Sequence, residues 1–241
     1  MSRRTWKYLL YSLTWSALDL LFPPTCAGCG RFGVRWCTDC QNKVVVLRGS
    51  LCEVCGLPQQ QAGMCEACRA DRPHFRVLRA WAVFDDPVRS ALHRLKYRRD
   101  MSMGDLLAAQ MLAFVEELCW PIDLIVPIPL GRQRLKERGY NQVGMVAWPL
   151  ALALDIQYAP GVLTRRRETR SQVGLSKPER RENVHQAFAA DARVRRRTVL
   201  VMDDVSTTGS TLSSSAEALF LSGASDVYAL TVARALKLEN A

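Results

Sequence analysis

The 241-residue chain is short of histidine, of acidic residues relative to basic ones, and of long apolar runs. Its three histidines, His74, His93 and His185, are scattered without metal-ligand spacing, so we assign them no role. The sequence contains no G-x-x-x-x-G-K-[ST] loop, which excludes the usual nucleotide triphosphatase site. The apolar run from Tyr8 to Phe22 has 15 residues where a membrane span needs about 20, so we expect no transmembrane segment.

The overall composition is that of a globular protein. The chain is 49% hydrophobic and 23% charged with 14 glycines and 11 prolines, which excludes disordered, collagen-like and low-complexity classes. Its length fits one or two domains. Because 33 basic residues face 23 acidic ones, the net charge of +10 favours polyanionic partners: phosphorylated small molecules, nucleic acid or an anionic membrane surface.

The N-terminus resembles an export signal, because Arg3 and Arg4 precede the apolar run. Three features argue against export: Asp19 lies inside the run, no A-x-A-like cleavage site precedes Cys26, and the many thiol pairs would oxidise outside the cytoplasm. We therefore expect a cytoplasmic protein.

Residues 1–24 are expected to form an amphipathic helix that ends at Pro23-Pro24. Helical spacing places one apolar face on Trp6, Leu9, Leu10, Leu13, Ala17, Leu20 and Leu21. The simplest interpretation is a helix that packs on the domain behind it. Since Tyr8, Tyr11, Trp15 and Leu18 make the opposite side apolar too, contact with a membrane surface or a partner is the alternative.

Eight of the nine cysteines form four C-x-x-C pairs within residues 26–68. The first unit contains Cys26, Cys29, Cys37 and Cys40, and the second contains Cys52, Cys55, Cys65 and Cys68. A C-x-x-C turn places two thiolates on one side, and two turns complete the four-sulfur tetrahedron that zinc prefers, at about 2.3 Å per bond. The sequence therefore predicts a double zinc ribbon with two structural Zn²⁺ ions over residues 25–75.

The C-x-x-C turns can be paired in two ways. Sequential pairing closes the shortest loops and is preferred, whereas interleaved pairing, in which alternate turns share a zinc, is the alternative. Iron–sulfur ligation and a redox disulfide are further alternatives. A four-sulfur shell leaves no open coordination position, so the predicted sites are structural rather than catalytic.

The stretch from Thr198 to Leu212 is the most informative part of the chain. The apolar run 199–202 is typical of a strand buried on both faces, as in a parallel sheet covered by helices. Apolar residues from Leu212 to Phe220 then follow helical spacing. A hydroxyl-rich loop with Gly209 just before a helix N-terminus directs backbone N–H groups at an anion, which predicts a phosphate-binding cup.

Asp203 and Asp204 follow the predicted strand, in the loop at its carboxyl end, where open α/β sheets bind ligands. Carboxylates accept hydrogen bonds from vicinal hydroxyls, so two acids beside a phosphate cup suit a ribose 5′-phosphate. The alternative is a loop whose acids and hydroxyls only cap the helix.

This strand, acid pair and Val-Ser-Thr-Thr-Gly-Ser-Thr loop are similar to the phosphoribosyl pyrophosphate motif of type I phosphoribosyltransferases. The resemblance implies that the candidate catalytic residues Asp203 and Asp204 bind the ribose. It implies that the 5′-phosphate is held by the loop, whose candidate substrate-binding residues are Ser206, Thr207, Thr208, Gly209, Ser210 and Thr211.

A second predicted strand, Asp123 to Leu130, ends in a proline-rich turn and is followed by a basic segment. In type I phosphoribosyltransferases the loop after this strand holds the pyrophosphate, often through a strained peptide. The resemblance therefore gives that role to Ile128, Pro129, Leu130, Gly131 and Arg132. This loop has fewer small and acidic residues than is typical of those enzymes.

Ordered motifs extend the resemblance over nearly the whole chain to the ComF family, with its ComFC and GntX relatives. The motifs are Leu95-Lys96-Tyr97, the Pro127 turn, Arg138-Gly-Tyr-Asn-Gln142, Gln172-x-Gly-Leu-Ser, Arg180-Arg-Glu-Asn183 with Phe188, and the Asp-Asp loop after the cysteine turns. The family is associated with natural competence and the use of external DNA. The resemblance implies single-stranded DNA and a competence helicase or another uptake protein as partners.

The basic run from Leu163 to Gln172, ahead of Ser176-Lys177-Pro178, lies where phosphoribosyltransferases carry a mobile loop that closes over the substrate. The alternative is a solvated face. No residue stands out as a general base for transfer.

Together these features predict an α/β protein with the type I phosphoribosyltransferase fold, a parallel sheet flanked by helices, in residues 76–241. The double zinc ribbon and the N-terminal helix precede it. The expected ligand is phosphoribosyl pyrophosphate with Mg²⁺. The alternative function is a non-catalytic factor of DNA uptake that binds single-stranded DNA or a helicase and uses the phosphoribosyl site only for sensing.

Overall fold

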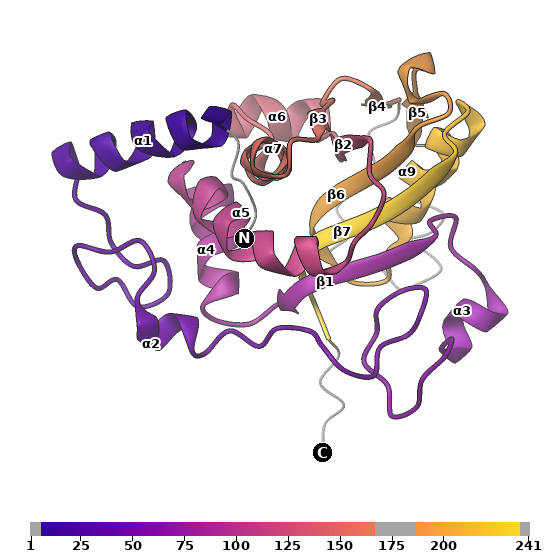
Figure 1. Cartoon of the computed structure of the whole chain (residues 1–241), viewed down its shortest axis with the longest axis horizontal. Coiled ribbons are helices and arrows are strands. Elements are labelled where there is room, and N and C mark those ends of the chain that lie inside the picture. The colour runs from indigo at the N-terminus through magenta and orange to yellow at the C-terminus, as the bar shows by residue number, and fades with distance from the viewer. Residues whose placement is uncertain (1–5, 167–186, 237–241) are drawn as a thin grey trace.

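The computed structural model describes residues 6–166 and 187–236. A five-stranded sheet in the order β1-β7-β6-β2-β3 forms its centre, and every neighbouring pair of strands is parallel. The strands are β1 (Val77–Val83), β2 (Leu124–Pro127), β3 (Gln157–Tyr158), β6 (Thr198–Ser206) and β7 (Asp226–Arg234). The short strands β4 (Leu163–Arg165) and β5 (Phe188–Ala190) pair antiparallel beside it. The predicted α/β class with a parallel sheet is confirmed (Figure 1).

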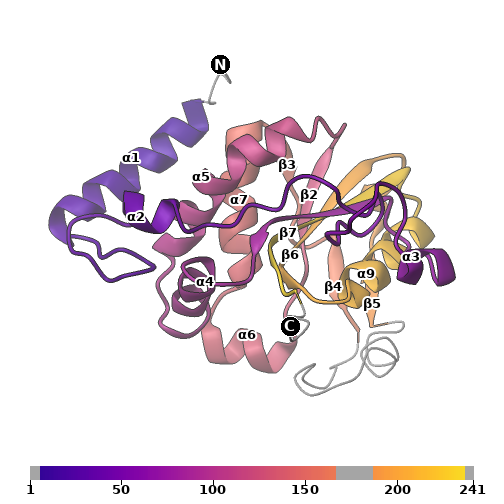
Figure 2. The ribbon, with the colours of Figure 1, turned by 90° about the horizontal axis from the view of Figure 1, so that it is seen from below.

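Helices cover both faces of the sheet (Figure 2). One face carries α4 (Val88–Tyr97), α5 (Ser102–Glu117) and α7 (Gln142–Leu154), and the other carries α9 (Ser210–Leu221). A short helix, α6 (Arg132–Arg138), follows β2, and a single 3₁₀ turn, η1 (Ala192–Val194), precedes β6.

The alternation of side chains along β6 explains this two-sided packing. Leu200 and Met202 belong to the core beneath α4, α5 and α7, whereas Val199 and Val201 belong to the core beneath α9. All four side chains are fully buried. A continuous apolar run is therefore required, because consecutive residues of a strand face opposite layers.

The N-terminal helix α1 (Trp6–Leu21) packs on the protein with the face opposite to the one that its spacing favoured. Tyr8 is buried, and Tyr11 lies edge-on to Trp148 of α7 with 5.1 Å between ring centroids. On the face expected to be packed, Leu13 is 62% exposed and Leu20 is 85% exposed. Aromatic rings supply more contact area than leucines, which accounts for the choice of the tyrosine face. Among the described helices, none is long and apolar enough to span a membrane.

The cysteine-rich segment contains two short helices, α2 (Thr38–Gln41) and α3 (Glu66–Ala70), and otherwise irregular backbone. Between its two halves, residues 45–47 run beside β1, with Val83 N–H donating to Val45 O at 2.9 Å and Leu47 N–H donating to Trp81 O at 2.9 Å. Main-chain hydrogen bonds therefore attach this segment to the edge of the sheet.

Candidate functional site

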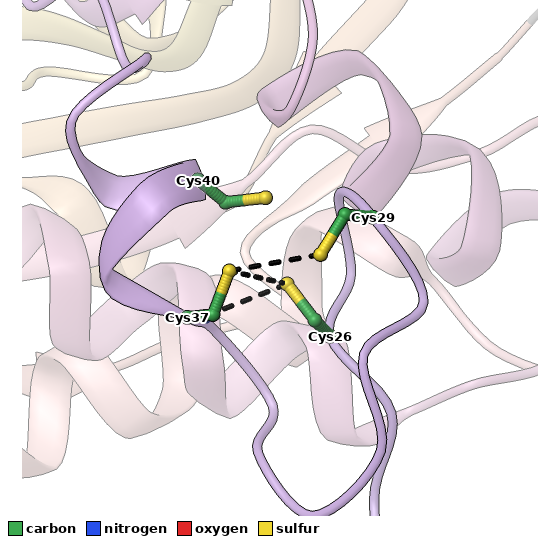
Figure 3. Close-up of side chains that lie close together, drawn as sticks. All are labelled: Cys26, Cys29, Cys37 and Cys40. Carbon is green, nitrogen blue, oxygen red and sulfur yellow. Dashed lines mark hydrogen bonds between the residues drawn. The ribbon is translucent and has the colours of Figure 1, made fainter.

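The eight clustered cysteines form two separate four-sulfur groups. Cys26, Cys29, Cys37 and Cys40 make one, and Cys52, Cys55, Cys65 and Cys68 make the other, with all sulfur atoms of a group within 4.8 Å of one another. Figure 3 shows the four sulfur atoms of the first group turned toward a common centre. The preferred sequential pairing is confirmed, and the interleaved alternative is wrong.

The sulfur geometry fits zinc. A tetrahedron with bonds of about 2.3 Å to the metal places its sulfurs about 3.8 Å apart. Cys37 Sγ lies 3.7 Å from Cys26 Sγ and 3.6 Å from Cys29 Sγ, and Cys55 Sγ lies 3.7 Å from Cys65 Sγ. These separations are far longer than a disulfide bond, so the groups are tetrahedral metal sites rather than oxidised pairs.

Backbone donors prepare the first cysteine of each group for metal binding. Cys37 N–H donates to Cys26 Sγ at 3.4 Å, and Cys65 N–H donates to Cys52 Sγ at 3.3 Å. Although burial opposes ionisation, these and neighbouring N–H groups lower the pKa of both Cys26 and Cys52 to about 6. A thiolate is the form that binds zinc, so the same backbone design serves both sites.

The predicted phosphate loop forms a small cup at the start of α9. It is lined by Asp203 and by residues 205–212. Gly209 has φ of +80°, a conformation that favours glycine, and it turns the chain into the helix. Thr208 Oγ1 and Ser210 Oγ lie 2.7 Å apart, and the first-turn N–H groups of α9 have no intrahelical acceptor. The cup therefore presents hydroxyl and amide donors to an anion.

Both acids lie inside β6 rather than in a loop after it, because the strand continues to Ser206. Asp203 pairs in register with Thr231 of β7, and Ser206 pairs with Arg234. Since alternate residues face opposite layers, Asp203 lines the cup while Asp204 faces α4 and α7. The two neighbours are therefore placed in different environments.

Asp204 is buried in a network of charges and hydrogen bonds. Its Oδ2 lies 2.8 Å from Lys96 Nζ of α4 and accepts from Gln142 Nε2 of α7 at 2.8 Å. Gln142 Oε1 in turn accepts from Arg138 Nη1 at 2.7 Å. A buried carboxylate requires such compensation, so these contacts satisfy Asp204 Oδ2 and fix the orientation of the side chain.

Asp203 lies in an environment that disfavours its ionised form. Burial first, and the negative charge of Asp204 second, raise the pKa of Asp203 to about 7. The N–H of Asp204, which donates to Asp203 Oδ1 at 2.8 Å, and the positive charges of Lys96 and Arg165 only partly offset this rise. The carboxyl facing the cup is consequently harder to ionise than an ordinary aspartate.

The predicted pyrophosphate loop lies beside the acids. Pro127 of β2 pairs in register with Met202, and Ile128 N–H donates to Met202 O at 2.8 Å. Asn141 Nδ2 donates to Ile128 O at 2.9 Å and fixes the loop. Among the described residues, none from Ile128 to Arg132 has a positive φ or a cis peptide, so the strained peptide typical of phosphoribosyltransferases does not occur here.

The second cysteine group lies behind the cup. Phe75 and Leu78, which follow it in sequence, are fully buried and approach the position where a Cβ on Gly209 would stand, at 3.6 and 3.5 Å. The buried guanidinium of Arg234 donates to Cys55 O at 2.5 Å, while Ala235 N–H donates to Ser206 O. The zinc ribbon therefore supports the phosphate loop from behind.

The fold places Asp203 beside the hydroxyl loop in one cup, turns Asp204 to the other face of the sheet, and holds Ile128 next to Met202, whereas the ligand roles given to these residues stay predictions. The predicted lid lies outside the described residues except for its start at 163–166. Lys96 and Gln142 stand in the sequence only as parts of motifs, and their contacts with Asp204 were not predicted. A lysine flanked by apolar helix positions is the one signal that pointed to Lys96, and its partner depends on how α4 packs.

These features define a class: a parallel α/β protein with a phosphate-type loop and two four-cysteine metal sites. A model of the double zinc ribbon domain family matches residues 17–69. The predicted zinc ribbon is confirmed by this match and by the sulfur geometry.

Curated relatives match almost the full length of the chain. DNA utilization protein YhgH of Escherichia coli O157:H7 is 31% identical over 214 residues, covering 86% of this chain and 92% of the relative. Competence protein F of Haemophilus influenzae is 29% identical over 83% of this chain and 90% of its own. Competence protein ComFC of Bacillus subtilis is 26% identical over 92% of this chain and 90% of its own. The chain belongs to the ComF family of competence and DNA utilization proteins.

Among solved structures, the chain resembles a glutamine phosphoribosylpyrophosphate amidotransferase from B. subtilis complexed with ADP and GMP. The TM-score is 0.36 at 22% identity, over 55% of this chain and 25% of the other. A hypoxanthine phosphoribosyltransferase from Staphylococcus aureus gives a TM-score of 0.32 at 14% identity, over 54% of this chain and 62% of the other. We draw nothing about ligands from these partial superpositions.

Proposed function

We propose that this protein binds phosphoribosyl pyrophosphate with Mg²⁺ in the cup of β6 and α9, and that it acts in the cytoplasm in natural competence or the use of external DNA. The observation that carries the proposal is the position of Asp203, whose carboxyl group borders the hydroxyl and amide donors of the loop. The names of the relatives support the biological context.

In this proposal the residues have distinct roles. The loop Thr207 to Thr211 holds the 5′-phosphate, and Asp203 accepts hydrogen bonds from the ribose hydroxyls. Asp204, fixed by Lys96 and Gln142, keeps the strand end rigid and holds a negative charge beside Asp203. The segment from Ile128 to Arg132 faces the pyrophosphate with its backbone and the Arg132 guanidinium.

The donor set fits magnesium. Mg²⁺ is usually bound by one or two carboxylates together with substrate phosphates and waters, and Asp203 offers one carboxylate next to the phosphate cup. When bound, Mg²⁺ neutralises the charge of the pyrophosphate. Asp204 is not suited to this role, because its Oδ2 is already shared by Lys96 and Gln142.

Calorimetric titration with phosphoribosyl pyrophosphate and Mg²⁺ at fixed salt tests the proposal. The wild type should bind one ligand, and Asp203→Asn should weaken binding at least tenfold without loss of fold. Arg48→Gln, which removes an exposed arginine paired with Glu117, is the matched control and should bind normally. A wild type that does not bind would overturn the proposal. Release of pyrophosphate on adding candidate acceptors tests transfer separately.

A second candidate function is the binding of single-stranded DNA without catalysis, and one observation favours it. Helix α6 has no buried residue and presents Arg134 and Lys136 to solvent. Next to it Tyr97 is 66% exposed, with the Arg138 guanidinium 5.3 Å from its ring centre. Exposed cations beside an aromatic ring are what single strands require for phosphate contact and base stacking.

Binding of a thymidine oligonucleotide at several salt concentrations tests this second function. The double variant Arg134→Gln, Lys136→Gln should lower affinity and flatten the log–log salt dependence by about 1.4, since each lost phosphate contact removes about 0.7 from a single-strand slope. The Arg48→Gln control should leave the slope unchanged. An unchanged slope in the double variant would exclude α6 as the DNA contact.

A further inference from the structure

A second cavity lies remote from the phosphate cup. It has a volume of about 690 Å³ and lies between the first cysteine turn, residues 25–30, and α4 with the turn that follows to Asp100. None of residues 203–212 lines it. In both views α4 lies at the same end of the molecule as α1 and α2, whereas α9 lies at the other end (Figures 1 and 2).

Both acids that line this cavity are already neutralised. Asp86 accepts from Arg89 Nη2 at 2.5 Å and from Ser90 Oγ at 2.6 Å, and these bonds lower the pKa of its carboxyl. Asp100 accepts from Arg94 Nη2 at 2.6 Å and from Ser102 Oγ at 2.6 Å. Each carboxylate therefore has one guanidinium and one hydroxyl as partners.

One guanidinium lacks such a carboxylate partner. Arg98 also lines the cavity, and within residues 6–166 and 187–236 no acidic group lies within 4.0 Å of its side chain. Arg89 donates to Asp86 through Nη2, and it also lines the cavity. Among the described residues, Arg98 is thus a guanidinium at the cavity without a carboxylate partner, and it offers charge-assisted donors to an anion.

An anion alone would leave most of the space empty. A volume of 690 Å³ lies within the range of about 300–1,000 Å³ that holds organic small molecules. The imidazole of His93 lies at the wall with its ring centroid 4.9 Å from that of Tyr97, which extends an aromatic surface from the cavity to the protein exterior. Arginine with a nearby aromatic pair suits a phosphate joined to a stackable ring.

We propose that this cavity is a second ligand site, which binds a nucleoside monophosphate with its phosphate on Arg98 and Arg89 and its base against His93. The site is distinct from the proposed phosphoribosyl site and does not depend on it. Its far wall is held by Arg94, whose Nη1 donates to Thr25 O at 3.0 Å and Cys26 O at 3.1 Å. The cavity therefore exists only while the first zinc ribbon is folded against α4.

Titration of the full-length, zinc-loaded protein with AMP, followed by calorimetry at fixed salt, tests this site. With phosphoribosyl pyrophosphate and Mg²⁺ present to occupy the cup, one AMP should bind per chain. Arg98→Gln should weaken binding about tenfold, because a charge-assisted bond to phosphate is lost. The neighbouring Arg99→Gln is the matched control, since Arg99 does not line the cavity and contacts Glu137 O instead, and it should bind AMP as the wild type does.

Further measurements distinguish AMP binding in this cavity from binding elsewhere on the protein. Asp203→Asn should leave AMP affinity unchanged, and a loss in that variant would place AMP in the phosphoribosyl cup and overturn the proposal. Inorganic phosphate should compete at least tenfold more weakly than AMP, because it lacks the base. Three other outcomes would also overturn the proposal. These are the absence of AMP binding, competition by phosphate as strong as that by AMP, and an Arg98→Gln variant with weaker binding of a thymidine oligonucleotide but not of AMP.

Discussion

Asp203 and Asp204 are neighbours in one strand, yet one is held by a cation and an amide, whereas burial raises the pKa of the other. Lys96 and Gln142 compensate the charge of Asp204 within a buried network. Asp203 has no ion pair within 4.0 Å among the described residues, and it meets a loss of hydration as well as the negative charge of Asp204. An acid whose pKa is raised beside a ligand-sized cup is typical of sites that bind or transform ligands.

The raised pKa of Asp203 predicts a pH dependence of ligand binding. The ionised carboxylate is the form that accepts hydrogen bonds from ribose hydroxyls and attracts Mg²⁺, so binding requires deprotonation. With a pKa of about 7, the ionised fraction and hence the affinity for Mg²⁺ and phosphoribosyl pyrophosphate should rise about tenfold between pH 6 and pH 8. Calorimetry in buffers of different ionisation enthalpy should detect release of one proton near pH 6.5.

Asp203→Asn provides the control for this pH profile, because phosphates of the ligand titrate in the same range. The variant should bind weakly with a flatter profile, and an equally steep profile would assign the titration to the ligand.

The carboxyl group of Asp203 also affects the stability of the fold. Since its folded pKa is raised, the group costs no stability below about pH 4, costs more as the pH rises from about 4 to 7, and costs a constant amount above about pH 7. Without ligand, the Asn variant should therefore melt higher at pH 8.

Lys96 is the residue on which the Asp204 network depends. Lys96→Met keeps the length and much of the packing of the side chain but leaves a buried carboxylate without its cation. Breaking one partner of a buried pair costs about 3 to 5 kcal/mol, so the variant should lose about 3 kcal/mol in urea unfolding. Adding Asp204→Asn should restore most of that loss. A double variant as unstable as the single one would mean that Lys96 acts through packing alone.

At the scale of elements, local patterns predicted the parts whose interactions are local. The short spacings between C-x-x-C turns predicted the sequential cysteine groups, because closing a short loop costs least entropy. The apolar run 199–202 and the hydroxyl loop predicted the strand, cup and helix of β6 and α9. The extension of β6 through both acids was not predictable, since pairing with β7 overrides the low strand propensity of aspartate.

Long-range packing determines two features that the sequence alone did not predict. Either face of α1 was apolar enough to be buried, and the choice of the Tyr8 face depends on Trp148, more than 130 residues away. The role of Lys96 likewise depends on where α4 packs against the carboxyl end of β6. In both cases the residue type was visible in the sequence, but its partner was not.

The two zinc ribbons differ in how they join the core, and this predicts different costs of losing each metal. Cys52, Cys55 and Cys68 belong to the same apolar cluster as the α9 face of the sheet, whereas Cys26, Cys37 and Cys40 form a small cluster of their own. Cys68→Ser should therefore lower the melting temperature more than Cys40→Ser. Metal analysis should find about two zincs in the wild type and about one in each variant. Equal melting temperatures would contradict the unequal coupling.

At the scale of the whole molecule, the division into residues 1–24, 25–75 and 76–241 remains a prediction of the sequence. Main-chain bonds cross its second boundary: Leu78 N–H donates to Val54 O at 2.7 Å, and residues 45–47 lie along β1. The buried Arg234 adds a side-chain link to Cys55 O. Elements joined by buried backbone bonds usually unfold together.

We therefore expect urea unfolding of the zinc-loaded protein to follow one transition, with tryptophan fluorescence and far-ultraviolet circular dichroism coinciding. Zinc is bound by the folded ribbons, so a chelator should move the midpoint of the whole transition to lower urea rather than release an early ribbon transition. Cys68→Ser should reproduce much of that shift. Two separated transitions, with the later one insensitive to chelator, would show instead that residues 76–241 fold independently and that the phosphate cup stands without the ribbon behind it.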